Sequence, residues 1–347
     1  MSRAQFIQAP ARPAKPLFTQ PALWIGVLIW GGLTGLAEML IVQTGGLPFG
    51  HMRPAMAGLS ATEQLLDVQK SALLALVIMG VGWFMTRGRV VPNLATRAPA
   101  RSQTWRELLL LVGYGVAAQV IGWRLGLALG QHPISLHLAG TLYGTYDTVR
   151  PAEVGTWAAY NFIAYALLPY VYFRRQGYSN EALSLKSNNP RADLRVLLVV
   201  LVIEAAAELF AYNGALFGLN ARQLLLGLPL ALSVNLFGTV LPIMVFLVSL
   251  IFPRLMKLSG SVTVTVLLGG LGYALLHVFE SWAMYTSPSS SALSVLFVLL
   301  QYVPPGMVKV VLTVRTANAW VHALGYHAVA PHVTVDTPLL VKIFGLK

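Results

Sequence analysis

Long apolar runs separated by short polar segments dominate this sequence. A helix that crosses a lipid bilayer needs about 20 mostly apolar residues. Eight runs approach or exceed that length: 21–42, 69–86, 106–130, 155–173, 195–218, 224–252, 260–282 and 291–314. A ninth run, 318–331, is shorter. The pattern therefore predicts an all-α, polytopic integral membrane helix bundle with eight transmembrane helices, or nine if the last run also crosses.

The composition agrees with this pattern. Of the 347 residues, 56% are hydrophobic and only 10% are charged, whereas soluble domains are about 25% charged. The chain contains no cysteine, which excludes disulfide bonds, thiolate metal ligands and cysteine nucleophiles.

The net charge of +12 is explained by where the basic residues lie. Every second connection between apolar runs is rich in Lys and Arg: 87–106, 174–195, 254–257, and Lys309 with Arg315. The alternate connections, 43–68, 131–154, 219–223 and 283–290, are poorer in both. This alternation is the positive-inside pattern, which argues against a nucleic-acid partner and predicts a cytoplasmic N-terminus, in a bacterial inner membrane.

The polar connections suggest how the chain is divided. Residues 1–20 are expected to form a cytoplasmic tail, and 21–173 to form transmembrane helices one to four. A cytoplasmic loop, 174–194, would lead to a C-terminal membrane core, 195–332, followed by a C-terminal tail, 333–347.

Ionisable residues inside predicted spans are the first candidates for chemistry, because each costs about 2.5–3.5 kcal/mol on insertion scales. These residues are Glu38, Arg124, Glu204, Glu208, His277 and Glu280. Glu38 and Arg124 are interpreted as a buried charge pair that fixes helix packing.

The other members of this set are spaced for joint action. Glu204 and Glu208 lie four residues apart and share one helix face, and His277 and Glu280 lie three apart and share another. A carboxylate near a histidine can hold a water molecule, take its proton and direct it at a carbonyl.

Three further histidines lie within TANAWVHALGYHAVAPH, residues 316–332. His322 is interpreted as a helix-packing or headgroup residue, and His332 as lying outside the helix after Pro331. His327 is predicted to turn inward, toward Glu208 and His277.

Three stretches together resemble the CPBP family of glutamic intramembrane proteases, which includes the CAAX-type prenyl endopeptidases. ELFAYNG, 208–214, resembles the family's Glu-Glu and Arg-Gly motif, with Leu209 at the second glutamate and Asn213-Gly214 in place of Arg-Gly. YALLH, 273–277, resembles Phe-x-x-x-His, and RTANAWVHALGYHAVAP, 315–331, resembles the approach to the late His-x-x-x-Asn.

The resemblance covers about residues 160–332 and implies a mechanism without metal or cofactor. Glu208 and His277 would activate a water molecule, and His327 would hold the oxyanion or the site geometry. Supporting residues would be Glu204, Asn213, Glu280, Asn235 and His332. The substrate would be a transmembrane or lipidated protein among membrane lipids.

Pro331 stands where the family has its asparagine, and such a donor can contribute about 2.7–4 kcal/mol. His332 or Asn235 could replace it, or the fold was kept while peptidase activity was lost.

Two other classes of function remain open. In a metal-dependent membrane enzyme, a divalent metal (zinc, iron or manganese) would bind oxygen and nitrogen ligands. The candidate ligands are Glu204, Glu208, His277, Glu280, His322 and His327. In a non-enzymatic transport, immunity or assembly protein, the same buried charges would form a proton relay or a binding site.

Overall fold

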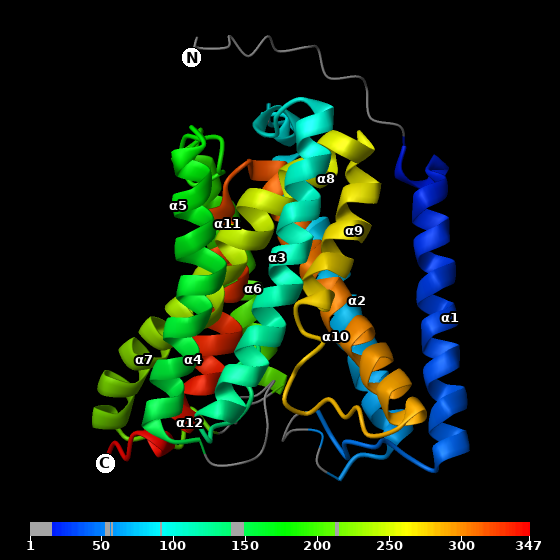
Figure 1. The fold of residues 1–347 in the computed structure, drawn as a ribbon. Coiled ribbons are helices and arrows are strands. Elements are labelled where there is room, and N and C mark those ends of the chain that lie inside the picture. The colour runs from blue at the N-terminus through cyan, green and yellow to red at the C-terminus, as the bar shows by residue number, and fades with distance from the viewer. Residues whose placement is uncertain (1–15, 53–55, 57, 91, 140–148, 212–214) are drawn as a thin grey trace.

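A computed structural model describes residues 16–347 apart from 53–55, 57, 91, 140–148 and 212–214 (Figure 1). All regular structure in these described residues is helical, which confirms the all-α class. Five helical runs are long and apolar enough to cross a membrane. They are α1 (Pro21–Thr44), α2 (Ala61–Thr86), α3 (Arg101–Ala128), the run Ala221–Ser259, and α10 (Pro288–Thr316).

The other predicted spans are shorter or divided. The predicted span 155–173 lies in α4 (Pro151–Asn161), a π-helical turn (Phe162–Leu167) and α5 (Leu168–Arg175). The predicted span 195–218 corresponds to α6 (Pro190–Ala211). The predicted span 260–282 is too long, because α9 (Val262–Leu275) ends in a series of tight turns. The structure thus shows five long apolar helices where the sequence predicted eight spans.

The run Ala221–Ser259 lies deepest in the bundle. It consists of α7 (Ala221–Asn235), two π-helical segments (Leu236–Val240 and Ile243–Ile251) and α8 (Phe252–Ser259). Every residue of the second π-helical segment is buried. Its all-round apolar sequence explains this position, since a helix without a polar face is stable only when neighbours or lipid surround it.

The C-terminal residues are not a tail, contrary to the prediction for 333–347. Here α11 (Ala319–His322) leads through π-helical segments (Ala323–His327 and Val329–Thr334) into α12 (Val335–Ile343). The last helix packs closely on α7, where a Cβ on Gly227 would lie 2.6 Å from a Val341 methyl carbon. Burial of this helix against α7 stabilises the C-terminal end.

The basic connections meet at one end of the bundle, where α3 begins and α10 ends (Figure 1). Arg97 donates hydrogen bonds to the Ser184 hydroxyl (2.5 Å) and the Ala317 carbonyl (2.6 Å). Arg89 and Asn318 both contact the carboxylate of Asp193, at 2.5 and 2.8 Å. Connections far apart in the sequence are therefore joined on one side of the bundle.

The predicted buried pair of Glu38 and Arg124 is wrong. The Glu38 carboxylate accepts a hydrogen bond from Thr62 of α2 at 3.0 Å. Arg124 is exposed on α3, with its guanidinium 5.0 Å from the centre of the Trp123 ring. Arg124 lies on an outward face of α3, so hydropathy alone misjudged its burial.

Candidate functional site: a buried histidine cluster

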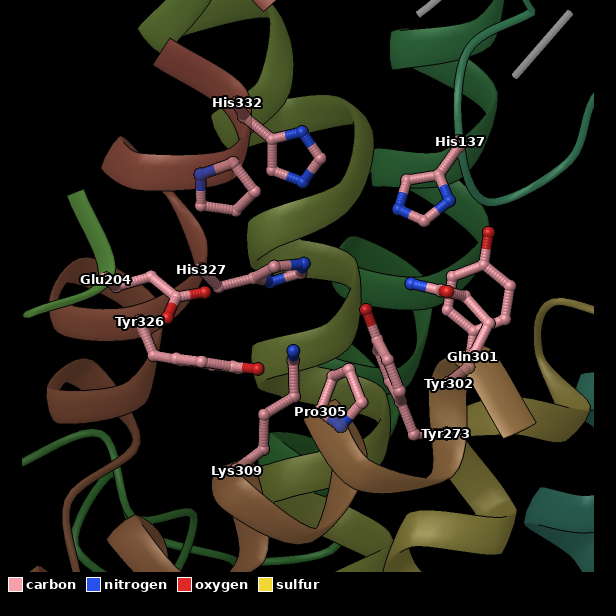
Figure 2. A pocket seen from close by; sticks show the side chains of 11 residues that line it. His137, Glu204, Tyr273, Gln301, Tyr302, Pro305, Lys309, Tyr326, His327 and His332 are labelled. Carbon is pink, nitrogen blue, oxygen red and sulfur yellow. The ribbon is translucent and has the colours of Figure 1, made fainter. Parts of the chain in front are cut away.

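A cavity of about 40 Å³ lies among α6, α9, α10 and the C-terminal helical run (Figure 2). This exceeds the roughly 10–15 Å³ that a single water molecule requires. Most of the side chains around it are polar: His137, His327, His332, Tyr273, Tyr302, Tyr326, Gln301, Glu204 and Lys309. A polar cavity inside an apolar bundle is a candidate functional site.

The π-helical geometry brings the C-terminal histidines onto one face. His322, His327 and His332 are spaced by five residues, a spacing that separates side chains on an α-helix. Here Ala328 and Val333 donate backbone hydrogen bonds to the carbonyls five residues earlier, at 2.8 and 3.3 Å. The ring centres of His322 and His327 are consequently 6.4 Å apart, and those of His327 and His332 are 5.1 Å apart.

A second group, beside the cavity, has the composition of a metal site. His137, His277 and Glu280 each offer a ligand atom, and these atoms all lie within 4.8 Å of one another. Nδ1 of His137 is 3.1 Å from Oε1 of Glu280. Two ligands on one tetrahedral zinc, each about 2.1 Å from the metal, would be about 3.4 Å apart. Small side-chain adjustments would thus let the three residues share one ion.

The local fold explains how these three residues meet. After α9, successive tight turns include hydrogen bonds from the His277 amide to Ala274 and from the Glu280 amide to His277, at 2.9 and 3.1 Å. His137 follows Ser135, whose carbonyl accepts a hydrogen bond from the Trp157 indole at 3.0 Å. Two irregular segments, held by hydrogen bonds, therefore position the ligand atoms.

Two histidines have the outer partners typical of metal ligands. Nδ1 of His277 lies 2.7 Å from the Tyr273 carbonyl, which can only accept, so Nδ1 carries the proton. Nδ1 of His332 lies 2.9 Å from the Asp336 carboxylate. In both rings Nε2 has no hydrogen-bond partner among the described residues. A histidine held at one nitrogen by a carbonyl or carboxylate presents the other to a metal.

Lys309 is the principal correction to the charge analysis. The sequence pattern grouped it with the basic loops, but it lies inside α10 with 1% of its surface exposed. Its Nζ is 4.1 Å from the centre of the Tyr273 ring and 4.8 Å from that of Tyr326. Figure 2 shows the ammonium directed into the cavity.

The three predicted catalytic residues do not line one common space. His327 lines the cavity, and His277 stacks on Tyr302 at its edge, with ring centres 3.9 Å apart. Glu208 is buried on α6 but is not one of the lining residues, whereas Glu204 is. Of the two glutamates, Glu204 is therefore better placed for chemistry with His327.

The remaining predicted residues have mixed positions. His322 is 0% exposed in α11, which agrees with its interpretation as a helix-packing residue. His332 is 2% exposed within the π-helical segment Val329–Thr334, so its predicted position outside a helix is wrong. The Asn235 amide donates to the Ala231 carbonyl of its own helix at 3.1 Å, which commits one of its donors. Asn213 lies outside the described residues.

Sequence reasoning missed His137 and the role of Lys309. His137 lies in an outer connection that was assessed only for its lack of Lys and Arg. A signal did exist for Lys309: it falls five residues before the end of the apolar run 291–314, at a depth where a cation is costly. The five-residue spacing of the late histidines was another unused signal.

No family model, curated protein or solved structure matches this chain. The functional argument accordingly rests on the geometry of the site.

Proposed function

We propose that this protein is a metal-dependent membrane enzyme that binds one divalent transition metal through His137, His277 and Glu280. The observation that carries the proposal is the convergence of these three ligand atoms within 4.8 Å. All three residues are at most 3% exposed, and two of their atoms, Nε2 of His277 and Oε2 of Glu280, have no hydrogen-bond partner among the described residues, which is costly in such a place. A bound cation would offset that cost.

Two histidines and one carboxylate leave coordination positions open on the metal. Catalytic zinc sites have this composition and lower the pKa of a bound water molecule, which then attacks a carbonyl or phosphoryl group. The adjoining cavity could hold the water and the reacting group of a substrate. Glu204 and His327 line that cavity and could accept the proton of the water. We therefore favour hydrolysis as the reaction.

Elemental analysis of the purified protein tests the metal site. We expect one zinc per chain, reduced well below stoichiometry in His277→Ala and Glu280→Gln. The matched control is His132→Ala, because His132 also lies beside a glutamate, Glu153, at 2.8 Å, but in a separate group. Wild-type protein without stoichiometric metal would overturn the proposal. Iron in place of zinc would contradict hydrolysis, since the same ligand set also suits Fe²⁺ oxygenases.

A metal-free glutamic intramembrane peptidase, the activity implied by the family resemblance, is the second candidate. It is favoured by the presence of Glu204 and His327 around one cavity. In this case a transmembrane or lipidated protein would be cleaved in the presence of a chelator. Glu204→Gln would abolish cleavage, and Glu208→Gln would test whether the glutamate indicated by the motif is also required. Loss of activity on metal removal would exclude this mechanism.

We also propose that the protein lies in a bacterial inner membrane with its N-terminus in the cytoplasm. The support is the grouping of the basic connections at one end of the bundle, where α1 begins (Figure 1).

A further inference from the structure

We infer that the cavity binds a small oxyanion, a carboxylate or phosphate group, through Lys309. The inference rests on the proposed function in one respect: the oxyanion would be the part of the substrate held beside the metal. Lys309 extends from α10 into the cavity, opposite His332 in the view of Figure 2.

The first argument is that Lys309 has no ion pair among the described residues, although it is 1% exposed. The other two buried cations of the described residues have polar partners. Arg254 contacts the Glu107 carboxylate at 2.6 Å, and Arg97 donates to the Ser184 hydroxyl and the Ala317 carbonyl, at 2.5 and 2.6 Å. Removing one partner from a buried ion pair is strongly destabilising, so buried cations are usually paired. A bound anion would supply the missing partner of Lys309.

The second argument comes from the groups around the ammonium. The rings of Tyr273 and Tyr326 face it and contribute cation–π attraction, but they cannot neutralise its charge. His327 lines the same space, and neither of its ring nitrogens has a hydrogen-bond partner among the described residues. The ring nitrogen that carries its proton and the ammonium can both donate to an oxyanion, as in other charge-assisted sites.

Three carboxylates lie in or beside the site, and they have different positions. Glu280 belongs to the metal group, and Asp336 contacts His332 at 2.9 Å. Glu204 is the one carboxylate that lines the described cavity, and it forms no ion pair with Lys309 there. The ammonium therefore remains available to an oxyanion.

The size of the cavity limits the ligand. About 40 Å³ accommodates a small anionic group but not an extended chain. The oxyanion could come from a free anion or from a phospholipid headgroup that reaches in from the membrane, and both share the same chemistry.

Calorimetric titration of chelator-treated protein in detergent tests the inference without metal. Sodium phosphate and sodium acetate are the probes, with sodium chloride at equal ionic strength as the reference. We expect phosphate, acetate or both to bind, and Lys309→Met to raise the dissociation constant about tenfold or more, because a charge-assisted contact is lost. Lys70→Met, at a side chain that is 78% exposed, is the matched control and should bind like wild type.

Dihexanoyl phosphatidic acid distinguishes the two sources. If it binds more tightly than phosphate, and binding is lost in Lys309→Met, the ligand is a lipid headgroup. If phosphate binds equally well, the ligand is a free anion. Either result supports the inference.

Other outcomes would overturn it. Wild-type protein that binds none of these probes, with or without zinc, excludes an oxyanion site. Equal affinity in Lys309→Met shows that any anion lies elsewhere. If Lys309→Met is too unstable to titrate, Lys309→Gln serves instead and should show the same loss of affinity. If Glu204→Gln restores the stability of Lys309→Met while wild type binds no anion, Lys309 is only a counterion for Glu204.

Failure of zinc binding leaves this anion titration intact, so the metal proposal and the oxyanion proposal fail separately.

Discussion

At the scale of single residues, the polar groups inside this bundle form two sets. The first set is paired with an oppositely charged side chain, and the second retains a side-chain atom without a hydrogen-bond partner among the described residues. Arg254 belongs to the paired set: its guanidinium contacts Glu107 at 2.6 Å and lies over the rings of Phe173 and Tyr178. His277, Glu280, His327 and His332 belong to the other set, because each retains a side-chain atom without a hydrogen-bond partner among the described residues. Residues of the first set stabilise the fold, and those of the second set lie at the candidate functional site.

Arg254→Met should be strongly destabilising. It leaves Glu107 without its guanidinium partner near the protein interior, and breaking a buried ion pair costs about 3–5 kcal/mol. The free energy of unfolding, from titration with dodecyl sulfate, is the measurement. Lys70→Met is the control, since Lys70 also pairs with a carboxylate, that of Asp67 at 3.9 Å, but has a 78% exposed side chain. Exposed pairs contribute about 0–1 kcal/mol. Equal losses in the two variants would contradict the distinction between them.

At the scale of elements, the π-helical segments determine which side chains meet. Such segments are rare and often occur at functional sites. In the C-terminal run, bonding between residues five apart aligns three histidines on one face. In the central run, Leu236–Val240 contains Gly238, whose backbone approaches the ring of Trp157. Both features fix contacts that an uninterrupted α-helix would not make.

Gly238→Ala should destabilise the protein. A Cβ at this position would lie 2.0 Å from two ring carbons of Trp157, whose indole is held by its hydrogen bond to Ser135. Overpacking of this kind costs about 1–3 kcal/mol. The thermal midpoint, followed by intrinsic fluorescence, should fall.

Gly113→Ala is the matched control, because nothing lies within 4 Å of the added carbon on α3. There the better helix propensity of alanine should stabilise the protein by about 0.5–1 kcal/mol. A lower midpoint in Gly113→Ala than in Gly238→Ala would show that the close approach to Trp157 does not limit substitution.

At the scale of the whole molecule, the two ends of the bundle differ in two respects. One end carries the basic connections and the start of the first long helix, and the other carries the end of the last helix. The basic connections gather where α1 begins, whereas α12 ends at the opposite end (Figure 1). The Gln223 side chain, which caps the start of α7, donates a hydrogen bond to the Leu346 carbonyl at 3.1 Å. This contact joins the C-terminus to a connection that is poor in lysine and arginine.

Reporter fusions should therefore place the two termini on opposite sides of the membrane. A fluorescent protein that matures only in the cytoplasm should be active at the N-terminus, and alkaline phosphatase should be active at the C-terminus. Phosphatase placed in the basic loop after Arg175 should be inactive, because positive charge retains that loop in the cytoplasm. Active phosphatase at both positions would contradict the orientation.

The sequence by itself determined the class of protein and most of its long helices. Hydropathy and the alternation of basic loops are sums over neighbouring residues, so they do not depend on packing. The sequence also indicated His277, Glu280, Glu204 and His327 as residues of interest, because an ionisable group in a membrane span is costly wherever its partners lie.

Only the tertiary structure decided which of these groups meet. His137 contacts Glu280 across 143 residues of sequence, and no local pattern links such positions. The early end of α9, the five-residue register of the C-terminal histidines and the inward path of Lys309 all depend on neighbouring helices. Packing against those neighbours favours the local hydrogen bonds and leaves the space that each feature requires, which is why the site arises from packing and not from any single motif.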